Sequence, residues 1–284
     1  MEWLIENLGH SSYQELYECA KRNHEAKLFV GFDKAFDANR AAKESPFIFV
    51  GSIEGCKIVR NHWPTKGVLY CSLDNYACTK YYSYFGSFLF NQDYIILPLS
   101  ELNRRKYFFY GLLGVEAKLF VRTNEGDKVF ESCLVDLQDF EGWYESKPQH
   151  SLVVVASPKK IRGEWRFICS KNKDIVAHSL YRYQGLLTLI PNVPPGALEL
   201  CHKILEVGYY PDSVFCVDIA EDEIGNYRLM ELNGFSSADL YACDKERIVE
   251  RVSEIALDDF KSAKVHATSY LSLDTPKNVG IIGT

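Results

Sequence analysis

Apolar residues in the first third of the chain form short continuous runs that alternate with amphipathic stretches. Four of these runs are typical of buried strands: residues 27–33, 46–50, 68–72 and 94–99. Before the first run, Ser12 and Glu15 form a capping box ahead of an amphipathic stretch that ends near Arg22, and residues 51–63 favour a second helix. Strands separated by helices predict a parallel or mixed α/β sheet.

The middle third has a different pattern, in which alternating strands are joined by turn residues. Residues 117–135 predict a hairpin with its turn at NEGD, and residues 164–183 predict another with its turn at KNKD. Residues 151–157 form a short apolar strand between the two hairpins. This part of the chain is therefore expected to be antiparallel.

The last third combines helices with a third hairpin. A helix is expected to begin at Pro195, with apolar residues on one face, and Gly208 can end it. Residues 214–233 predict a hairpin with its turn at EDEIGN, and Asp244 can cap a final amphipathic helix. From about residue 265 the chain is polar without a clear period. We expect residues 265–284 to form a loosely held tail.

Composition is that of an ordinary soluble globular protein. The 284 residues, 47% of them hydrophobic and 25% charged, leave room for two or three subdomains. The net charge of -6 argues against a nucleic-acid partner, because binding to phosphate backbones requires a basic face. No apolar stretch approaches the ~20 residues that a membrane span needs, and the acidic N-terminus lacks the pattern of a secretion signal.

The nine cysteines are scattered along the chain, and none forms a CxxC motif. Several lie inside apolar runs, so we interpret them as reduced core residues rather than disulfides or zinc ligands. Reduced cysteines are typical of a cytoplasmic protein, which is the compartment we expect. Nothing in the sequence indicates an oligomeric state.

The third hairpin carries the most informative polar residues. On its second strand, alternation places four residues on one face: Tyr227, Leu229, Glu231 and Asn233. If the turn is centred between Ile224 and Gly225, Asp218 lies directly opposite Glu231. Two carboxylates ~4 Å apart repel by about 4 kcal/mol at an effective dielectric near 20. A cation would relieve this repulsion, and the oxygen ligands of Asp218, Glu231 and Asn233 suit Mg²⁺. The alternative is an exposed hairpin with solvated acids.

The first hairpin carries a pair of cations. A turn over residues 123–127 would place Arg122 across from Lys128, and paired cations disfavour each other unless an anion lies between them. An Arg fork with a Lys point charge suits a polyphosphate. The alternative is a solvated surface hairpin.

The second hairpin places Glu164 and Arg166 in alternation with aromatic residues. Burying an Arg in such a strand is costly unless it is paired or functional. The alternative is a surface pair of Glu164 with Arg166. Arg182 and His178, on the following strand, are weaker candidates.

The order of these segments is a basic hairpin, an apolar strand, an Arg-bearing hairpin and an acidic hairpin that ends in MELN. This order resembles the ATP-grasp superfamily, and more closely a branch with short, uncharacterised bacterial and phage members. Five stretches carry the resemblance: FVRTNEGDKVFES, VVVASPKKIRGEWRF, IVAHSLYRY, FCVDIAEDEIGNYRLMELN and GFSSADLYACD. With GSIEG and YIILPLSEL, which resemble the preceding region of that branch, the resemblance covers most of residues 46–257. The branch usually has Arg-Pro-Asp where this chain has Arg122-Thr123-Asn124, which loosens the predicted turn.

The resemblance implies a combined α/β and α+β architecture, the ATP-grasp fold. A Rossmann-like pre-ATP-grasp subdomain would cover residues 1–105. An ATP-grasp domain would cover residues 106–264, with two lobes that divide near 153–190, before the tail. The implied activity is ligation of a carboxylate to an amine with ATP and Mg²⁺, through an acyl phosphate. An amino acid, a peptide or a protein terminus would all be compatible substrates.

The resemblance also implies roles by matched position. Arg122 and Lys128 match the binders of the ATP phosphates, and Arg182 is a further candidate for nucleotide binding. The strand whose backbone contacts adenine is matched by Val153, Val154, Val155, Ala156 and Ser157. Glu164 and Arg166 match active-site positions, with Arg166 facing the transferring phosphoryl group. The magnesium ligands are matched by Asp218, Glu231 and Asn233.

Two other functions are compatible with the sequence. A non-catalytic nucleotide-binding module would bind ATP without turnover, although it would have little need of the full set of matched carboxylates and cations. An acidic interaction protein without a nucleotide would require the three hairpins to be coincidental.

Overall fold

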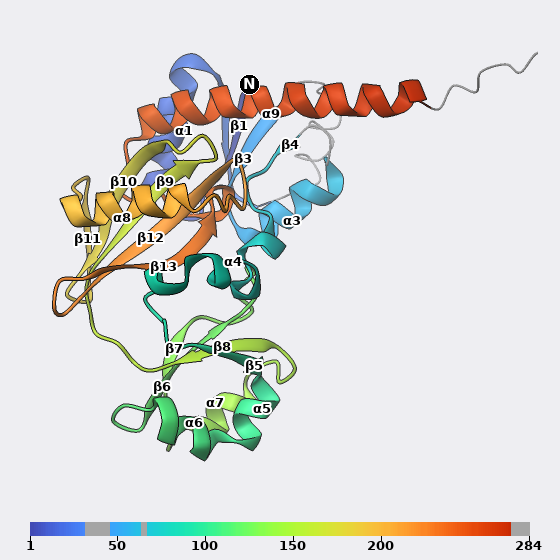
Figure 1. Cartoon of the computed structure of the whole chain (residues 1–284). Coiled ribbons are helices and arrows are strands. Elements are labelled where there is room, and N and C mark those ends of the chain that lie inside the picture. The colour runs from blue at the N-terminus through green and yellow to red at the C-terminus, as the bar shows by residue number, and fades with distance from the viewer. Residues whose placement is uncertain (32–45, 64–66, 274–284) are drawn as a thin grey trace, which may run out of the picture.

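The computed structural model describes residues 1–31, 46–63 and 67–273, and these residues contain three sheets. In Figure 1 the first and third sheets lie side by side in the upper part of the molecule, and the second forms a separate lobe below them. The predicted combination of an α/β part with α+β lobes is confirmed.

The first sheet has the strand order β2-β1-β3-β4, and all of its pairs are parallel. Its strands and helices are β1 (Glu2–Glu6), α1 (Ser11–Asn23), β2 (Glu25–Phe29), β3 (Phe47–Val50), α3 (Ile53–His62) and β4 (Gly67–Val68). The sequence did not predict β1, because EWLIE mixes acidic and apolar residues. All five of its residues are nevertheless buried, since β1 lies between two neighbouring strands.

The boundaries of two strands in this sheet differ from the prediction. The strand expected at 27–33 begins and ends earlier, at Glu25–Phe29, and residues 32–45 lie outside the described part of the chain. The strand expected at 68–72 is reduced to the two residues Gly67–Val68. Short apolar runs therefore marked the position of a strand better than its ends.

One of the two helix starts in this region was predicted incorrectly. His10 occupies the N-cap of α1, and the Ser12 hydroxyl donates to Asp239 Oδ1 at 2.6 Å instead of capping its own helix. Helix α3 is capped by Ser52, whose side chain accepts a hydrogen bond from the Gly55 N–H. The predicted capping box thus serves a tertiary contact.

The second sheet has the order β5-β8-β6-β7 and is antiparallel throughout. Its elements are β5 (Ile95–Pro98), α5 (Leu99–Arg104), α6 (Lys106–Leu113), β6 (Lys118–Thr123), β7 (Cys133–Asp136), α7 (Phe140–Glu145) and β8 (Leu152–Ala156). Side chains from the helices and the sheet share one core, which includes Leu99, Phe109, Val121 and Phe140. The predicted strand at 94–99 belongs to this lobe, because Ile95 pairs with Val155.

The third sheet has the order β11-β10-β9-β12-β13 and is also antiparallel. Its elements are β9 (Ile161–Ser170), β10 (Ile175–Tyr183), β11 (Leu186–Ile190), α8 (Pro195–Glu206), β12 (Val214–Asp222) and β13 (Tyr227–Gly234). The hairpins predicted at 164–183 and 214–233 and the helix at Pro195 are confirmed, whereas β11 was not predicted. The connections between sheets contain η1 (Leu73–Tyr76), α4 (Cys78–Phe85), η2 (Gly86–Phe88) and η3 (Phe235–Ser237).

Both faces of the third sheet are covered over part of their length. Helix α8 packs on one face, where Leu200 and Ile204 join a core with Phe167 and Val217. On the other face, residues of β9 and β12 share a core with the first sheet, α1 and the C-terminal helix α9. This arrangement leaves the far end of that second face for polar residues.

Helix α9 spans Lys245–Leu273, which is longer than predicted. Asp244 caps it as expected, because its carboxylate accepts a hydrogen bond from the Arg247 N–H at 3.1 Å. The helix continues into the region predicted as a tail because extending a formed helix requires little, and no Gly or Pro occurs before Pro276. Residues 274–284 lie outside the described part of the chain.

Two predictions from composition can be compared with the structure. All nine cysteines are free, and most are buried, as expected of core residues. Within the described ranges, no helix has both the length and the apolar composition to cross a membrane.

Candidate active site

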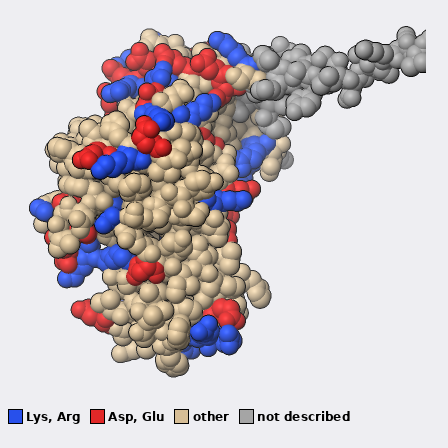
Figure 2. Space-filling model, viewed as in Figure 1, with Lys and Arg blue, Asp and Glu red and all other residues tan. Residues whose placement is uncertain are grey.

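A cavity of about 650 Å³ lies between the second and third sheets. In Figure 2 the molecule narrows on the left where these lobes meet, and Lys and Arg side chains edge the notch. The predicted site residues that line the cavity are Arg122, Lys128, Glu164, Arg166, Arg182 and Glu231. His178 points elsewhere, since its ring packs against Phe167 with 6.1 Å between ring centroids.

The acidic hairpin has the predicted register. Asp218 pairs directly with Glu231, and Gly225 in the turn has a φ of +87°, which glycine adopts readily. A bulge follows the pair, so that Ile219 lies opposite Leu229. The prediction that Leu229 and Glu231 share a face is therefore wrong. Leu229 packs into the core, as does Tyr227 beside it.

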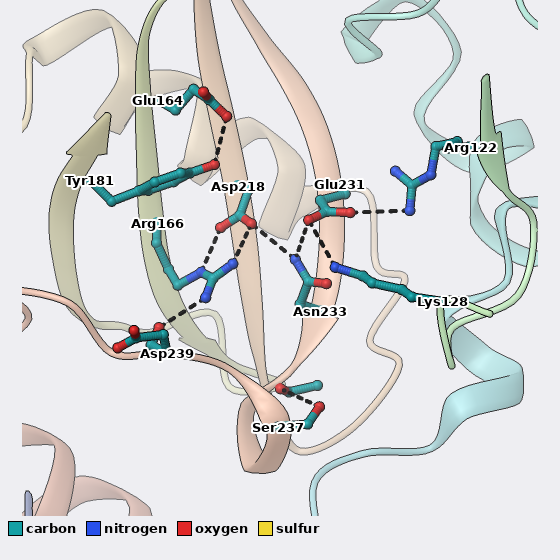
Figure 3. Close-up of polar contacts among 11 residues, drawn as sticks. Arg122, Lys128, Glu164, Arg166, Tyr181, Asp218, Glu231, Asn233, Ser237 and Asp239 are labelled. Atoms are coloured by element: carbon teal, nitrogen blue, oxygen red, sulfur yellow. Dashed lines mark hydrogen bonds and ion pairs between the residues drawn. The ribbon is translucent and has the colours of Figure 1, made fainter. Parts of the chain in front are cut away.

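Each carboxylate of the hairpin is paired with cations, as Figure 3 shows. Arg166 donates to both oxygens of Asp218, at 2.8 Å from Nε and 2.7 Å from Nη2. Arg122 and Lys128 approach the two oxygens of Glu231 at 3.1 and 3.2 Å. The carboxylate repulsion expected from the sequence is offset by these cations, so it does not by itself require a metal ion.

The basic hairpin differs from the prediction but brings its two cations together. Its second strand, β7, begins at Cys133, and within the sheet Arg122 pairs with Val154 rather than with Lys128. Lys128 lies in the loop before β7, where its φ is +50°. The two cations converge because both reach Glu231 from the second lobe, across the cavity.

These ion pairs shift the pKa values of their members. Burial opposes ionisation of Glu231, yet the positive charges of Lys128 and Arg122 hold the pKa of Glu231 well below its ordinary value. Burial also disfavours the charged form of Arg166, but Asp218 raises the pKa of Arg166 well above its usual range. The site is therefore a set of fixed charges at neutral pH.

Aromatic residues that the sequence did not predict hold Arg166 in place. The rings of Tyr181 and Tyr241 are stacked, with centroids 4.7 Å apart, and the Arg166 guanidinium carbon lies 5.7 and 5.0 Å from them. Arg166 Nη1 also donates to the Asp239 carbonyl at 2.8 Å. Tyr241 and Asp239 come from the loop after β13, so only the fold brings them to Arg166.

Glu164 is buried at one end of the cavity. The Tyr181 hydroxyl donates to its Oε2 at 2.9 Å, and Arg182 lies 3.5 Å from its Oε1. Burial raises the pKa of Glu164, and the negative charges of Asp218 and Glu231 add to the effect, while Tyr181 and Arg182 oppose it. Glu164 and Glu231 thus have pKa values shifted in opposite directions.

The model of a known family matches residues 99–252, which is more than half of the chain. Its description is that of an ATP-grasp domain, the third family of its clade. The chain belongs to this family. The ATP-grasp superfamily that the sequence resembles is thereby confirmed. A search of curated proteins found no match.

Solved structures share the ATP-grasp fold at low sequence identity. D-cycloserine synthetase DcsG matches with a TM-score of 0.61 at 11% identity, covering 90% of this chain and 99% of its own. D-alanine–D-alanine ligase from Bacillus anthracis, in complex with ATP, matches with a TM-score of 0.57 at 13% identity, covering 92% and 98%. ATP-grasp ligase PsnB with a minimal precursor matches with a TM-score of 0.56 at 11% identity, covering 89% and 98%.

The strand predicted to contact adenine lies inside the second sheet of this ATP-grasp domain. Val153–Ala156 are fully buried, and β8 pairs with β5 on one side and β6 on the other. The backbone of these residues is therefore engaged in the sheet. Ser157 is the first residue beyond β8, and its N–H donates to Asp93 Oδ2 at 3.0 Å. Lys159 contacts the same carboxylate at 2.6 Å.

The predicted magnesium ligands also converge in the ATP-grasp domain. Asn233 Nδ2 lies 2.9 Å from Asp218 Oδ2 and 2.9 Å from Glu231 Oε1, so a single point lies between the two carboxylates. Among the described residues no three His, Cys, Asp or Glu side chains cluster, and this set contributes two carboxylates and one amide. Carboxylate and amide oxygens at one point suit Mg²⁺, which usually takes one or two carboxylates.

Proposed function

We propose that this ATP-grasp protein is an ATP-dependent ligase that joins a carboxylate to an amine. In the first step, a substrate carboxylate oxygen attacks the γ-phosphorus of ATP, and ADP leaves. In the second, the amine attacks the carbonyl carbon of the acyl phosphate, inorganic phosphate leaves, and the amine loses a proton. The main support is the convergence of two carboxylates and three cations on one cavity between the two lobes.

The cations of the cavity suit the phosphoryl-transfer step. Arg122 and Lys128 enter from the second lobe, whereas Arg166 enters from the third sheet. Phosphoryl transfer is catalysed mainly by positioning and by charges that stabilise the transferring group. We assign the ATP phosphates to Arg122 and Lys128, and the transferring phosphoryl group to Arg166. Arg166 would exchange part of its contact with Asp218 for this group.

Asp218, Glu231 and Asn233 would hold Mg²⁺ in this proposal. When bound, Mg²⁺ would neutralise charge on the phosphates of ATP. Arg166 and Lys128 now neutralise the same carboxylates, so the structure keeps the charges of the site balanced before a nucleotide binds. The lobes on either side of the cavity would exclude water, which would otherwise hydrolyse the acyl phosphate.

Two other predicted roles fit the same cavity. The adenine is proposed to lie near the end of β8, where Ser157 follows the buried Val153–Ala156. Glu164 is proposed to accept the proton that the attacking amine releases, because a raised pKa makes a carboxylate a stronger base. Arg182, 3.5 Å from Glu164, would then support the charge on the phosphates or on Glu164.

The experiment is a measurement of ADP release with Mg²⁺ over a panel of amino acids and peptides. Asp218→Asn keeps the shape of the side chain but removes one negative charge from the proposed metal site, and we expect it to lower turnover by at least about 100-fold, as small misplacements do. Asp174→Asn is the matched control, because Asp174 pairs with Arg251 outside the cavity. Unchanged turnover in Asp218→Asn would contradict the site assignment. Tight ATP binding without turnover for any acceptor would favour a non-catalytic ATP-binding module.

A further inference from the structure

Strand β11 is an apolar edge strand with unusual exposure. It forms the end of the third sheet, at the left of the upper part of Figure 1. Four of its five side chains are large and apolar, and their exposed fractions are high: Leu186 72%, Leu187 70%, Leu189 46% and Ile190 44%. Natural edge strands are usually protected from pairing by charges, proline or a covering element. The sequence LLTLI contains neither charge nor proline.

The exposed side chains of β11 continue from the wall of the cavity. Leu187 lies opposite Arg182 in the sheet, and Arg182 lines the cavity. Directly opposed residues lie on the same face, so Leu187 and Leu189 extend the cavity face to the edge of the sheet. One strand, β10, separates β11 from Arg166 on β9, which corresponds to about 10 Å at the usual strand spacing. A chain that paired with β11 would therefore pass close to the reacting centre.

The size of the strand decides between two kinds of occupant. A second copy of this chain that paired through β11 would contribute five residues, whereas a stable interface uses about 20–30 residues from each partner. An extended peptide gains its affinity differently, from backbone hydrogen bonds to the edge and from side chains placed alternately on either face. Five residues are an adequate length for this mode.

Charge at the cavity end of the strand indicates which segment fits. The turn between β10 and β11 is flanked by Arg182 and Arg162, whose side chains are 53% and 50% exposed. Each is only 3.5 Å from one carboxylate, Glu164 and Glu221 respectively. An apolar segment with an acidic residue or a carboxylate at this end would complement both the leucines and the arginines.

We propose that β11 binds an extended apolar segment of a polypeptide substrate by strand addition, with a carboxylate of that segment toward Arg182. The substrate is then a peptide or protein rather than a free amino acid. That the bound chain is a substrate rests on the proposed ligase function. The pairing itself rests on β11 alone.

The test uses peptides selected from a library of random 12-residue sequences displayed on phage. Binding of the selected peptides is measured by fluorescence polarisation to the wild type, to Leu187→Lys/Leu189→Lys and to a control, Leu112→Lys. Leu112 is 56% exposed on α6, so the control removes an equally exposed leucine away from the sheet. We expect enriched peptides with alternating apolar residues, at least tenfold weaker binding to the β11 variant and unchanged binding to the control.

A second measurement tests strand pairing from the side of the ligand. N-methylation of every second amide of a selected peptide should weaken binding at least tenfold in one phase and leave it unchanged in the other, because only alternate amides of a paired strand face the edge. The thermal shift with ATP and Mg²⁺ is recorded for each variant. Retained shifts show an intact nucleotide site, so a failure of peptide binding remains distinct from a failure of the proposed function.

Three outcomes would overturn the proposal. The first is that no peptide is enriched, or that enriched peptides bind the β11 variant as well as the wild type. The second is equal sensitivity to N-methylation in both phases, which would exclude strand pairing. The third is a dimer of the wild type that Leu187→Lys/Leu189→Lys makes monomeric, since β11 would then bind a second copy of this chain.

Discussion

Replacement of Arg166 by Met is the most informative perturbation of the site. Arg166 makes two hydrogen bonds to Asp218, and the two side chains are 8% and 1% exposed. Removing one partner of a buried ion pair costs about 3–5 kcal/mol, because the other charge stays buried without compensation. At about 2.1 cal/mol/K of unfolding entropy per residue, this loss lowers the Tm of a 284-residue chain by about 5–8 °C.

The Arg166→Met variant also tests the proposed metal ligands without an activity assay. Arg166 occupies both oxygens of Asp218, so it competes with any cation for them. We expect Mg²⁺ alone to raise the Tm of Arg166→Met by more than it raises that of the wild type. Adding Asp218→Asn should recover part of the lost stability and abolish the response to Mg²⁺, as a double-mutant cycle would show.

Arg182→Met is the control for this comparison. Arg182 is 53% exposed and lies 3.5 Å from Glu164, so its loss should cost no more than about 1 kcal/mol and leave the Mg²⁺ response unchanged. Differential scanning calorimetry with and without Mg²⁺ measures both quantities. A Tm of Arg166→Met within about 2 °C of the wild type would show that Asp218 does not depend on Arg166, and the description of the site would be wrong.

Three further variants test the electrostatics and the loop of Lys128. Because the pKa of Glu231 is lowered in the fold, its charge stabilises above its unfolded pKa near 4.3, so Glu231→Gln should be less stable than the wild type at pH 7 by about 1–3 kcal/mol, with the gap closing as the pH falls below about 4. The pKa of Glu164 is raised, so its ionisation opposes folding, and Glu164→Gln should be more stable than the wild type at pH 7, with that gap also closing in acid; urea unfolding across pH would contradict the pKa directions if the two variants changed stability in the same sense. A Cβ on Gly126 would lie 2.4 Å from the Leu73 carbonyl oxygen, so Gly126→Ala should shift the loop that carries Lys128 and weaken ATP binding about tenfold by calorimetric titration, whereas Gly111→Ala, whose Cβ meets nothing within 4 Å, should bind normally.

The acidic hairpin shows what local sequence could determine. Gly225 identified the centre of the turn, and because strand side chains alternate with a period of two, the turn placed Asp218 opposite Glu231. The bulge after this pair was not predictable from residue types. It moves Leu229 from the predicted polar face into the core. A single inserted residue was thus enough to reverse half of the predicted strand.

The cations of the second lobe show where local pattern was insufficient. The segment that follows Lys128 alternates like a strand, but Phe130 is buried in the core of the lobe and the strand begins only at Cys133. Long-range packing therefore replaced the predicted short turn with a loop. Lys128 still reaches Glu231, because the loop lies across the cavity from β13. Tyr241 was beyond local prediction, since it meets Arg166 only through the loop after β13.

Strand phase explains why Arg166 and Asp218 could be selected and Lys128 could not be placed. On β9, Arg166 is two residues from Ile168, and on β12, Asp218 is two residues from Cys216. Ile168 and Cys216 both belong to the core that the third sheet shares with the first. The charged residues therefore occupy the continuation of a buried face, where an unpaired charge would be costly and pairing is required. A charge in phase with core positions of a strand is a stronger indicator of a site than a charge in a turn, because the strand fixes the direction of the side chain and the core fixes its burial.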